Sequence, residues 1–245
     1  DSAEERRAFF EQMWNSPGFS KLTSNYPDLL FNADANAEWC EFLAKENFYI
    51  GLSLDGPKEL HDHYRVTKGQ KTTHKQVVQA FQMLRRAKVH VDLLCVVHDV
   101  NVKYPTQVYR YFKEIGGQYL QFLPLVEKTG DPNNPVHKRS VPAAAYGKFL
   151  NTIFDEWMRH DIGKIFIQLF DESVRPFLGM EHALCIYRET CGDVPVVEHN
   201  GDFYSCDHYV LPEYKIGNIH DRPLAEMVED PKQREFGQKK WTSLP

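Results

Sequence analysis

The chain of 245 residues lacks several features that would place it in a broad class at once. It has no uninterrupted run of about 18 apolar residues and no apolar signal-peptide core near its start, so we expect neither a membrane span nor a secretory leader. Lys and Arg number 29 against 34 Asp and Glu, so the net charge of -5 offers no basic surface for nucleic acid. We therefore expect a cytoplasmic protein that binds neither nucleic acid nor a membrane.

Several common enzyme signatures are also missing. The sequence contains no Gly-x-Ser-x-Gly, no His-Glu-x-x-His, no P-loop and no dinucleotide fingerprint, so the usual hydrolase and nucleotide-binding classes have no support. Internal repeats and low-complexity tracts are absent too. A composition of 42% hydrophobic and 26% charged residues instead indicates a globular protein with a sizeable core.

Strand-like and helix-like segments alternate along the first two thirds of the chain. The predicted strands lie in 48–57, 90–98, 119–127 and 162–170. Helices are predicted over 73–87 and 105–115, and a third, long helix follows Ser140. A Thr73–Gln76 capping box is expected to begin the first of these helices, and Ser140 to cap the third. Such alternation is typical of parallel βαβ units, so the predicted fold class is α/β. Ligands of such folds gather at the carboxyl ends of the strands, here 53–56 and 123–127.

The five cysteines divide into two groups. Cys40 and Cys95 lie in apolar surroundings and are expected to be small core residues. The other three are Cys185, Cys191 and Cys206. They follow residue 179, where predicted turns and short segments replace the alternation of strands and helices. An odd number of cysteines without a secretory signal argues against a disulfide framework.

A hairpin about Asn200-Gly201 is predicted to bring two of these thiols together. A type I′ turn there would pair His199 with Asp202 and place Pro195 opposite Cys206. Spacing alone leaves three alternatives open: structural zinc, with a fourth ligand from a nearby histidine, an iron-sulfur cluster, or unliganded cysteines. The candidate fourth zinc ligands are His182, His199 and His208.

Three segments together resemble a known family. They are residues 51–65 (Gly-Leu-Ser-Leu-Asp-Gly-Pro-Lys-Glu-Leu-His-Asp-His-Tyr-Arg), residues 121–127 (Gln-Phe-Leu-Pro-Leu-Val-Glu), and Cys185-x5-Cys191-x14-Cys206-Asp207-His208. In their order and intervals they are similar to the anaerobic sulfatase-maturating enzymes, which are radical S-adenosylmethionine (SAM) enzymes with a C-terminal SPASM domain. The resemblance extends from about Glu38 to the end of the chain.

The resemblance implies a partial (β/α) radical-SAM-type barrel over 1–179, followed by part of a small cysteine-rich SPASM-like module with a β-hairpin over 180–245. It implies SAM and 4Fe-4S clusters as cofactors, a sulfatase polypeptide as substrate, and an electron donor such as flavodoxin or ferredoxin. The product would be formylglycine, made from a Cys or Ser by 5′-deoxyadenosyl radical chemistry. Carried over by position, Ser53, Arg65 and Leu125 would contact SAM, Cys185, Cys191 and Cys206 would ligate auxiliary clusters, and Asp207 would be the base.

The sequence also departs from the family. Its Cys-x3-Cys-x2-Cys, which would hold the cluster that reduces SAM, is absent, and residues 28–35 match the preceding strand and loop only in part. We therefore expect a maturase truncated at both ends and inactive alone. The alternatives are a related radical SAM/SPASM enzyme that modifies peptides, and a non-catalytic, zinc-stabilised binding module.

Overall fold

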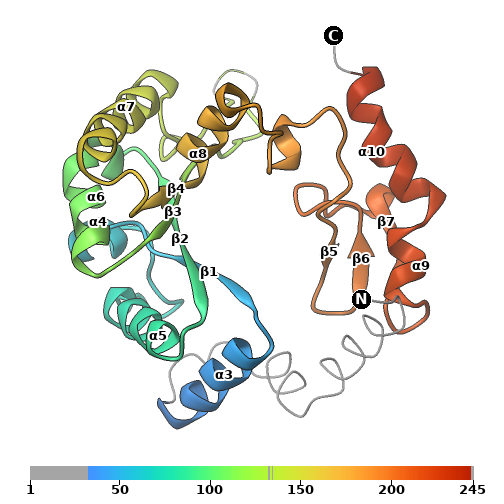
Figure 1. The fold of residues 1–245 in the computed structure, drawn as a ribbon, viewed down its shortest axis with the longest axis horizontal. Helices are drawn as coiled ribbons and strands as arrows, with labels where there is room; N and C mark the ends of the chain where they lie inside the picture. The colour runs from blue at the N-terminus through green and yellow to red at the C-terminus, as the bar shows by residue number, and fades with distance from the viewer. Residues whose placement is uncertain (1–32, 132, 134, 244–245) are drawn as a thin grey trace. The chain divides into compact units, whose positions relative to one another are not determined.

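The computed structural model describes residues 33–131, 133 and 135–243, which form two compact units divided between Ser173 and Val174 (Figure 1). Each unit has its own sheet and its own buried side chains. Most of the segment 28–35 lies outside the described residues. None of the helices in the described residues is both long enough and apolar enough to cross a bilayer.

The first unit is built on a parallel four-stranded sheet with the order β1-β2-β3-β4. Its strands are β1 (Tyr49–Ser53), β2 (His90–Val97), β3 (Tyr119–Pro124) and β4 (Phe166–Ile167). Its helices are α3 (Ala33–Lys45), α4 (Lys58–His61), α5 (His74–Arg86), α6 (Pro105–Glu114), α7 (Ala143–His160), α8 (Gln168–Val174) and the short 3-10 helix η1 (Asn101–Lys103). Figure 1 shows α5, α6 and α7 on one face of this sheet. The predicted α/β architecture is confirmed.

Alternation along β2 explains which face of the sheet is covered. Leu93, Cys95 and Val97 are fully buried, whereas the residues between them are only half-buried. This period of two places the apolar set against the helices and leaves the other face for polar or ligand-binding side chains. The prediction that Cys40 and Cys95 are core residues is confirmed, since both are buried.

The predicted fourth strand is wrong over most of its length. Within 162–170 only Phe166 and Ile167 form a strand, and α8 begins at the next residue. The carbonyl of Ile165 accepts a hydrogen bond from the Trp157 indole at 2.8 Å, and the amide of Ile165 bonds back to Asp161. Because the amide and carbonyl of Ile165 bond to Asp161 and Trp157, they are not available for pairing in the sheet, and β4 begins only at Phe166.

Both predicted helix caps are also wrong. Helix α7 begins at Ala143, and the Ser140 hydroxyl accepts a hydrogen bond from the Glu127 amide at 2.9 Å instead. Thr73 precedes α5 but makes no side-chain cap. The carboxylate of Asp62 takes that role, since its Oδ1 accepts from the amides of Thr73 and His74 at 3.1 and 2.9 Å.

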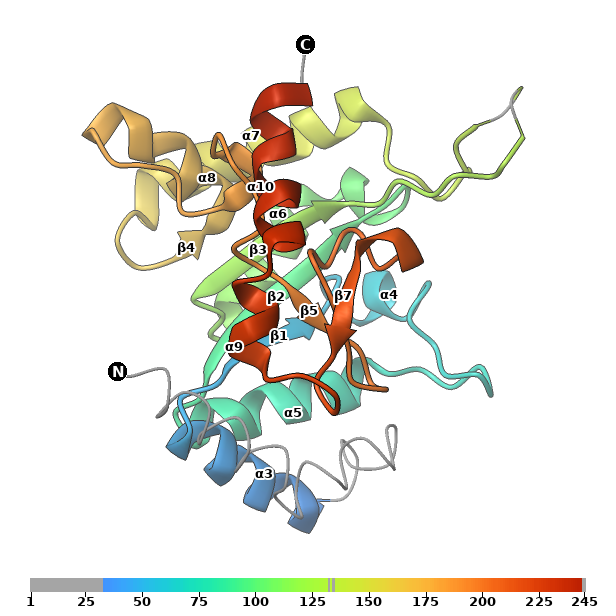
Figure 2. The ribbon, with the colours of Figure 1, turned by 90° about the vertical axis from the view of Figure 1, so that its right-hand side faces the viewer.

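The second unit contains an antiparallel sheet with the order β5-β6-β7 (Figure 2). Its strands are β5 (Val196–Val197), β6 (Asp202–Tyr204) and β7 (Lys215–Asn218); its helices are α9 (Leu224–Val228), α10 (Pro231–Ser243) and the 3-10 helices η2 (Arg175–Leu178), η3 (Cys185–Tyr187) and η4 (Pro212–Tyr214). Phe203 and Met227 are its most buried large side chains.

The predicted hairpin exists, but its register is wrong by one residue. Val197 pairs with Phe203, and the amide of Glu198 bonds to the carbonyl of Asp202, so the loop has three residues. Gly201 alone in this loop takes a positive φ, of 85°. A three-residue loop that ends on such a glycine replaces the type I′ turn.

Candidate functional site

The carboxyl end of β1 leads into a buried carboxylate. Asp55 is only 3% exposed, and its side chain accepts three hydrogen bonds. Two come from Arg65, whose Nε lies 2.5 Å from Oδ2 and whose Nη2 lies 3.2 Å from Oδ1; the third comes from the amide of Val96 at 2.9 Å. The carboxylate thus ties β1 to β2 and faces a guanidinium in the bidentate geometry that stabilises such pairs.

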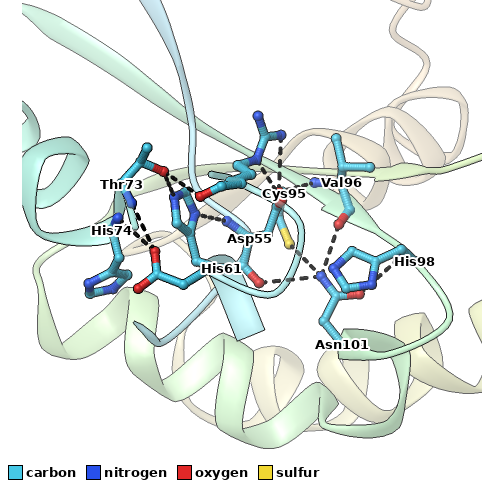
Figure 3. Close-up of polar contacts among 10 residues, drawn as sticks. Asp55, His61, Thr73, His74, Cys95, Val96, His98 and Asn101 are labelled. Atoms are coloured by element: carbon cyan, nitrogen blue, oxygen red, sulfur yellow. Dashed lines mark hydrogen bonds and ion pairs between the residues drawn. The ribbon is translucent and has the colours of Figure 1, made fainter. Parts of the chain in front are cut away.

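A fully buried asparagine ties the same strand ends together. The amide nitrogen of Asn101 donates to the carbonyls of Asp55 and Val96 at 3.3 and 2.9 Å, and its oxygen accepts from the amide of His98 at 2.8 Å. Figure 3 shows these contacts around the strand ends. The Asp55 carboxylate and the Asn101 amide are therefore each satisfied by several partners, which fixes the two strand ends relative to each other.

A histidine completes the network on the other side of Asp55. His61 is fully buried, and its Nδ1 accepts from the Asp55 amide at 3.2 Å. This bond leaves the proton of the neutral ring on Nε2, which lies 3.1 Å from the Thr73 hydroxyl. The Thr73 hydroxyl in turn donates to the carbonyl of Arg65 at 2.7 Å (Figure 3). Burial is the main cause that lowers the pKa of His61 to about 4, so the ring is neutral at physiological pH.

The structure places all three predicted SAM-contacting residues at this carboxyl-terminal edge of the sheet. Ser53 is the exposed last residue of β1 and pairs with Leu94. Leu125 lies just past β3, where its amide bonds to the carbonyl of Val97 at 2.9 Å and its own carbonyl accepts from Val141 at 3.0 Å. The Arg65 side chain is 31% exposed.

Arg65 retains hydrogen-bonding capacity for a ligand. A guanidinium has five N–H groups, of which two donate to Asp55 in the part of the chain that the structure describes. The remaining donors suit an anionic group such as the carboxylate of SAM. The residues present therefore fit SAM. From the sequence, Asp55 was expected only as part of the ligand-binding strand end 53–56, and neither His61 nor Asn101 was singled out. No local pattern marks a histidine in α4 or an asparagine in the short helix after β2 as a partner of that strand end.

The second unit holds the three remaining cysteines on segments attached to α10. The amide nitrogen of Gln233 donates to the carbonyls of Gly192 and Ser205 at 2.8 and 3.1 Å, next to Cys191 and Cys206. The ammonium of Lys240 donates to the carbonyls of Cys185 and Ile186 at 2.7 and 2.8 Å. One helix thus positions all three cysteine segments.

Gly237 allows one of these segments to approach α10 closely. Its carbonyl accepts from the amide of Cys191 at 3.0 Å, and an ideal Cβ at this position would lie only 2.3 Å from the Cys191 carbonyl oxygen. No side chain fits in that space without a backbone shift. The close contact explains why a glycine interrupts an otherwise regular helix.

All three thiols are free and half-buried. Burial is the main cause that raises the pKa of the Cys206 thiol, and the neighbouring Asp207 carboxylate acts in the same direction. Ligand atoms of Cys206, Asp207 and His208 lie within 4.8 Å of one another, a grouping that, within the described residues, does not include Cys185 or Cys191. The thiols fit an iron-sulfur cluster or a zinc ion by their chemistry, as three of the ligands that either would need.

Comparison with known proteins points to one family. A family model described as SPASM, an iron-sulfur cluster-binding domain, matches residues 190–245. The serine-type anaerobic sulfatase-maturating enzyme of Bacteroides thetaiotaomicron is 41% identical over 221 residues, covering 85% of this chain and 53% of the relative. A cysteine-type enzyme of Clostridium perfringens strain 13 is 35% identical over 204 residues, covering 81% of this chain and 54% of that relative.

The solved structures agree with the sequence relatives. Native anSMEcpe with bound AdoMet matches with a TM-score of 0.73 and 32% identity, over 87% of this chain and 58% of that chain. The same protein with AdoMet and the Kp18Cys peptide also matches with a TM-score of 0.73. The chain spans about half the length of the curated relatives it matches, and by both sequence and fold it belongs to the family of anaerobic sulfatase-maturating enzymes.

Proposed function

We propose that this chain is part of an anaerobic sulfatase maturase that oxidises a Cys or Ser of a sulfatase to formylglycine in the cytoplasm. The observation that carries the proposal is the set of three free, half-buried thiols attached to α10, of which Cys191 and Cys206 lie within the region that matches an iron-sulfur domain and Cys185 lies five residues before it. Reduced thiols of this kind suit a reducing compartment. A small redox protein such as flavodoxin or ferredoxin would supply the electron that starts the reaction.

The carboxyl edge of the parallel sheet would bind SAM. When bound and reduced by a 4Fe-4S cluster, SAM would supply the radical chemistry that takes a hydrogen atom from the β-carbon of the substrate residue. Arg65 would bind the SAM carboxylate through its uncommitted N–H groups, while Ser53 and Leu125 would contact the remainder of the molecule. Because the Arg65 guanidinium is paired with the buried Asp55 carboxylate, it meets the cofactor as an already oriented cation.

The second unit would take the proton and the electron. Asp207, whose side chain is 57% exposed, is accessible to a substrate, and its carboxylate would accept the proton from the thiol or hydroxyl of the substrate residue. Cys185, Cys191 and Cys206 would ligate an auxiliary 4Fe-4S cluster that would accept the electron. These losses would convert Ser directly to formylglycine, whereas Cys would give a thioaldehyde that water would hydrolyse to formylglycine with release of hydrogen sulfide. The Cys206 sulfur and the Asp207 carboxylate lie 3.4 Å apart, so the base would be next to a cluster ligand.

A product assay tests the proposal. The 245-residue chain lacks Cys-x3-Cys-x2-Cys and is expected to make no 5′-deoxyadenosine; joined to a segment that supplies this motif, it should convert a sulfatase peptide to the formylglycine form. Asp207→Asn should still make 5′-deoxyadenosine but not formylglycine, whereas His199→Asn, at an 85% exposed side chain, should behave as wild type. Cleavage of SAM by the chain alone, or full product formation by Asp207→Asn, would contradict the proposal.

A second candidate, a zinc-stabilised module, is favoured by one observation. The ligand atoms of Cys206, Asp207 and His208 lie within 4.8 Å of one another, and all three residue types bind zinc. One zinc per chain without acid-labile sulfide would support this candidate and contradict the enzymatic one.

A further inference from the structure

The side chain and the main chain of Arg65 are both held by the network behind the strand ends. Its guanidinium donates to Asp55, and its carbonyl accepts from Thr73 at 2.7 Å. Thr73 is in turn bonded to His61, and His61 to the amide of Asp55. These bonds form a closed ring that starts and ends at Asp55, so neither end of Arg65 can move without breaking it. Figure 3 shows the part of this ring that joins Asp55, His61 and Thr73.

This closed ring of hydrogen bonds gives each of its members one hydrogen-bonding role and His61 one tautomer. The Asp55 amide donates to Nδ1 of His61, so only the tautomer with the proton on Nε2 satisfies both ring nitrogens. That proton lies toward the Thr73 hydroxyl, whose own proton must then go to the Arg65 carbonyl. Every donor in the ring has one acceptor, and burial of His61 and Asp55 keeps water from competing.

The pairing also determines which edge of the guanidinium is available. Nε and one N–H of Nη2 are used by Asp55, so the donors that remain are on Nη1 and on the far side of Nη2. Two such parallel N–H groups match one carboxylate. SAM has one carboxylate and no other anionic group, so a fixed guanidinium selects the amino-acid end of the cofactor.

We propose that Asp55, His61 and Thr73 are positioning residues that fix the direction of the Arg65 guanidinium for the carboxylate of SAM. This inference rests on the proposed function. Pre-organisation of this kind improves affinity because the long arginine side chain loses little further freedom when the ligand binds.

Thr73 is the cleanest probe of this role. Asp55 also bonds to Val96, so its removal disturbs the sheet as well as Arg65. The Thr73 hydroxyl contacts His61 and Arg65, whereas its amide, which meets Asp62, is kept in a valine variant. Thr73→Val therefore opens the ring without changing the charge of any group. Thr72→Val is the matched control, because Thr72 is the exposed neighbour of Thr73.

Two measurements on the 245-residue chain test the proposal. The first is the ¹⁵N NMR signal of the Arg65 Nε–H, assigned by its loss in Arg65→Lys. It should exchange slowly with solvent in wild type and Thr72→Val, and about tenfold faster in Thr73→Val. The second is calorimetric titration with SAM and with 5′-methylthioadenosine, which lacks the carboxylate. Thr73→Val should bind SAM several-fold and Asp55→Asn about tenfold more weakly, while affinity for 5′-methylthioadenosine stays unchanged.

The outcomes separate this inference from the proposed function. If wild type binds SAM and Thr73→Val binds it equally well, the positioning role is refuted and the proposed function stands. If Thr73→Val lowers the affinity for SAM and for 5′-methylthioadenosine by the same factor, the closed ring of hydrogen bonds is only structural and the inference is also refuted. If wild type binds neither ligand, the proposed SAM site itself is wrong and the inference falls with it.

Discussion

Acidification should weaken the first unit through His61. The imidazole of His61 is fully buried. Burial, opposed in part by the charge of Asp55, lowers the pKa of His61 to about 4, whereas an unfolded histidine titrates near pH 6.5. The folded state therefore favours the neutral ring. Its stabilising contribution is fully present above about pH 6.5 and is lost as the pH falls toward 4.

The size of the effect follows from the two pKa values. Each unit of difference corresponds to about 1.4 kcal/mol, so His61 alone should cost ~2 kcal/mol between about pH 7.5 and about pH 5, approaching ~3 kcal/mol near pH 4. Protonation would also remove the acceptor that Nδ1 offers to the Asp55 amide. Burial lowers the pKa of His74 and His98 as well, so the wild-type loss should exceed the share of His61.

Urea unfolding at both pH values, followed by far-UV circular dichroism, measures this loss. His61→Asn is expected to be less stable at neutral pH but to lose ~2 kcal/mol less than wild type on acidification. His199→Asn, at an exposed position, should retain the wild-type pH dependence. If His61→Asn loses as much stability as wild type over the same interval, His61 is not the buried neutral group that the structure indicates.

Four further variants test the packing within each unit. Gly237→Ala should lower the melting temperature and the iron content, because its Cβ would press on the Cys191 carbonyl; Gly147→Ala, in α7 with open space around it, should be neutral or stabilising by up to ~1 kcal/mol in thermal melts. Leu93→Ala, at a fully buried position in β2, should cost ~3 kcal/mol in urea unfolding, and a cost below ~1 kcal/mol would contradict the packing described. Asn101→Ala should cost ~2–3 kcal/mol in the same assay, because it leaves buried backbone groups unpaired, and an unchanged midpoint would show that water replaces the amide.

The α/β rhythm could be predicted from the sequence because it depends on local periodicity. The apolar run in β2 and the helical spacing of apolar residues in α5 and α6 reflect how each element is buried, and both features are visible within about ten residues. The errors arose where a distant partner decides the structure. Ser140 bonds to Glu127 rather than to a helix end, and the hairpin loop is bonded to β7, since the Asn218 side chain donates to the carbonyl of Asn200.

The candidate site shows the same division. The family resemblance supplied Arg65 and the cysteines, but nothing in local sequence predicts that the Arg65 guanidinium meets Asp55 or that Thr73 bonds to its carbonyl. The hydrogen bonds from Gln233 to Gly192 and Ser205 could not be predicted either, because Gln233 lies 41 and 28 positions from them in the chain. Such contacts form only in the tertiary structure, when residues that are far apart in the sequence come together.

The most direct test of the central claim is the iron, zinc and acid-labile sulfide content of the chain isolated and reconstituted without oxygen. The account predicts iron and sulfide in similar amounts in wild type and in Cys40→Ala, whose thiol lies in the core, and a large loss of both in Cys191→Ala. Zinc without sulfide, or iron content equal in wild type and Cys191→Ala, would contradict it.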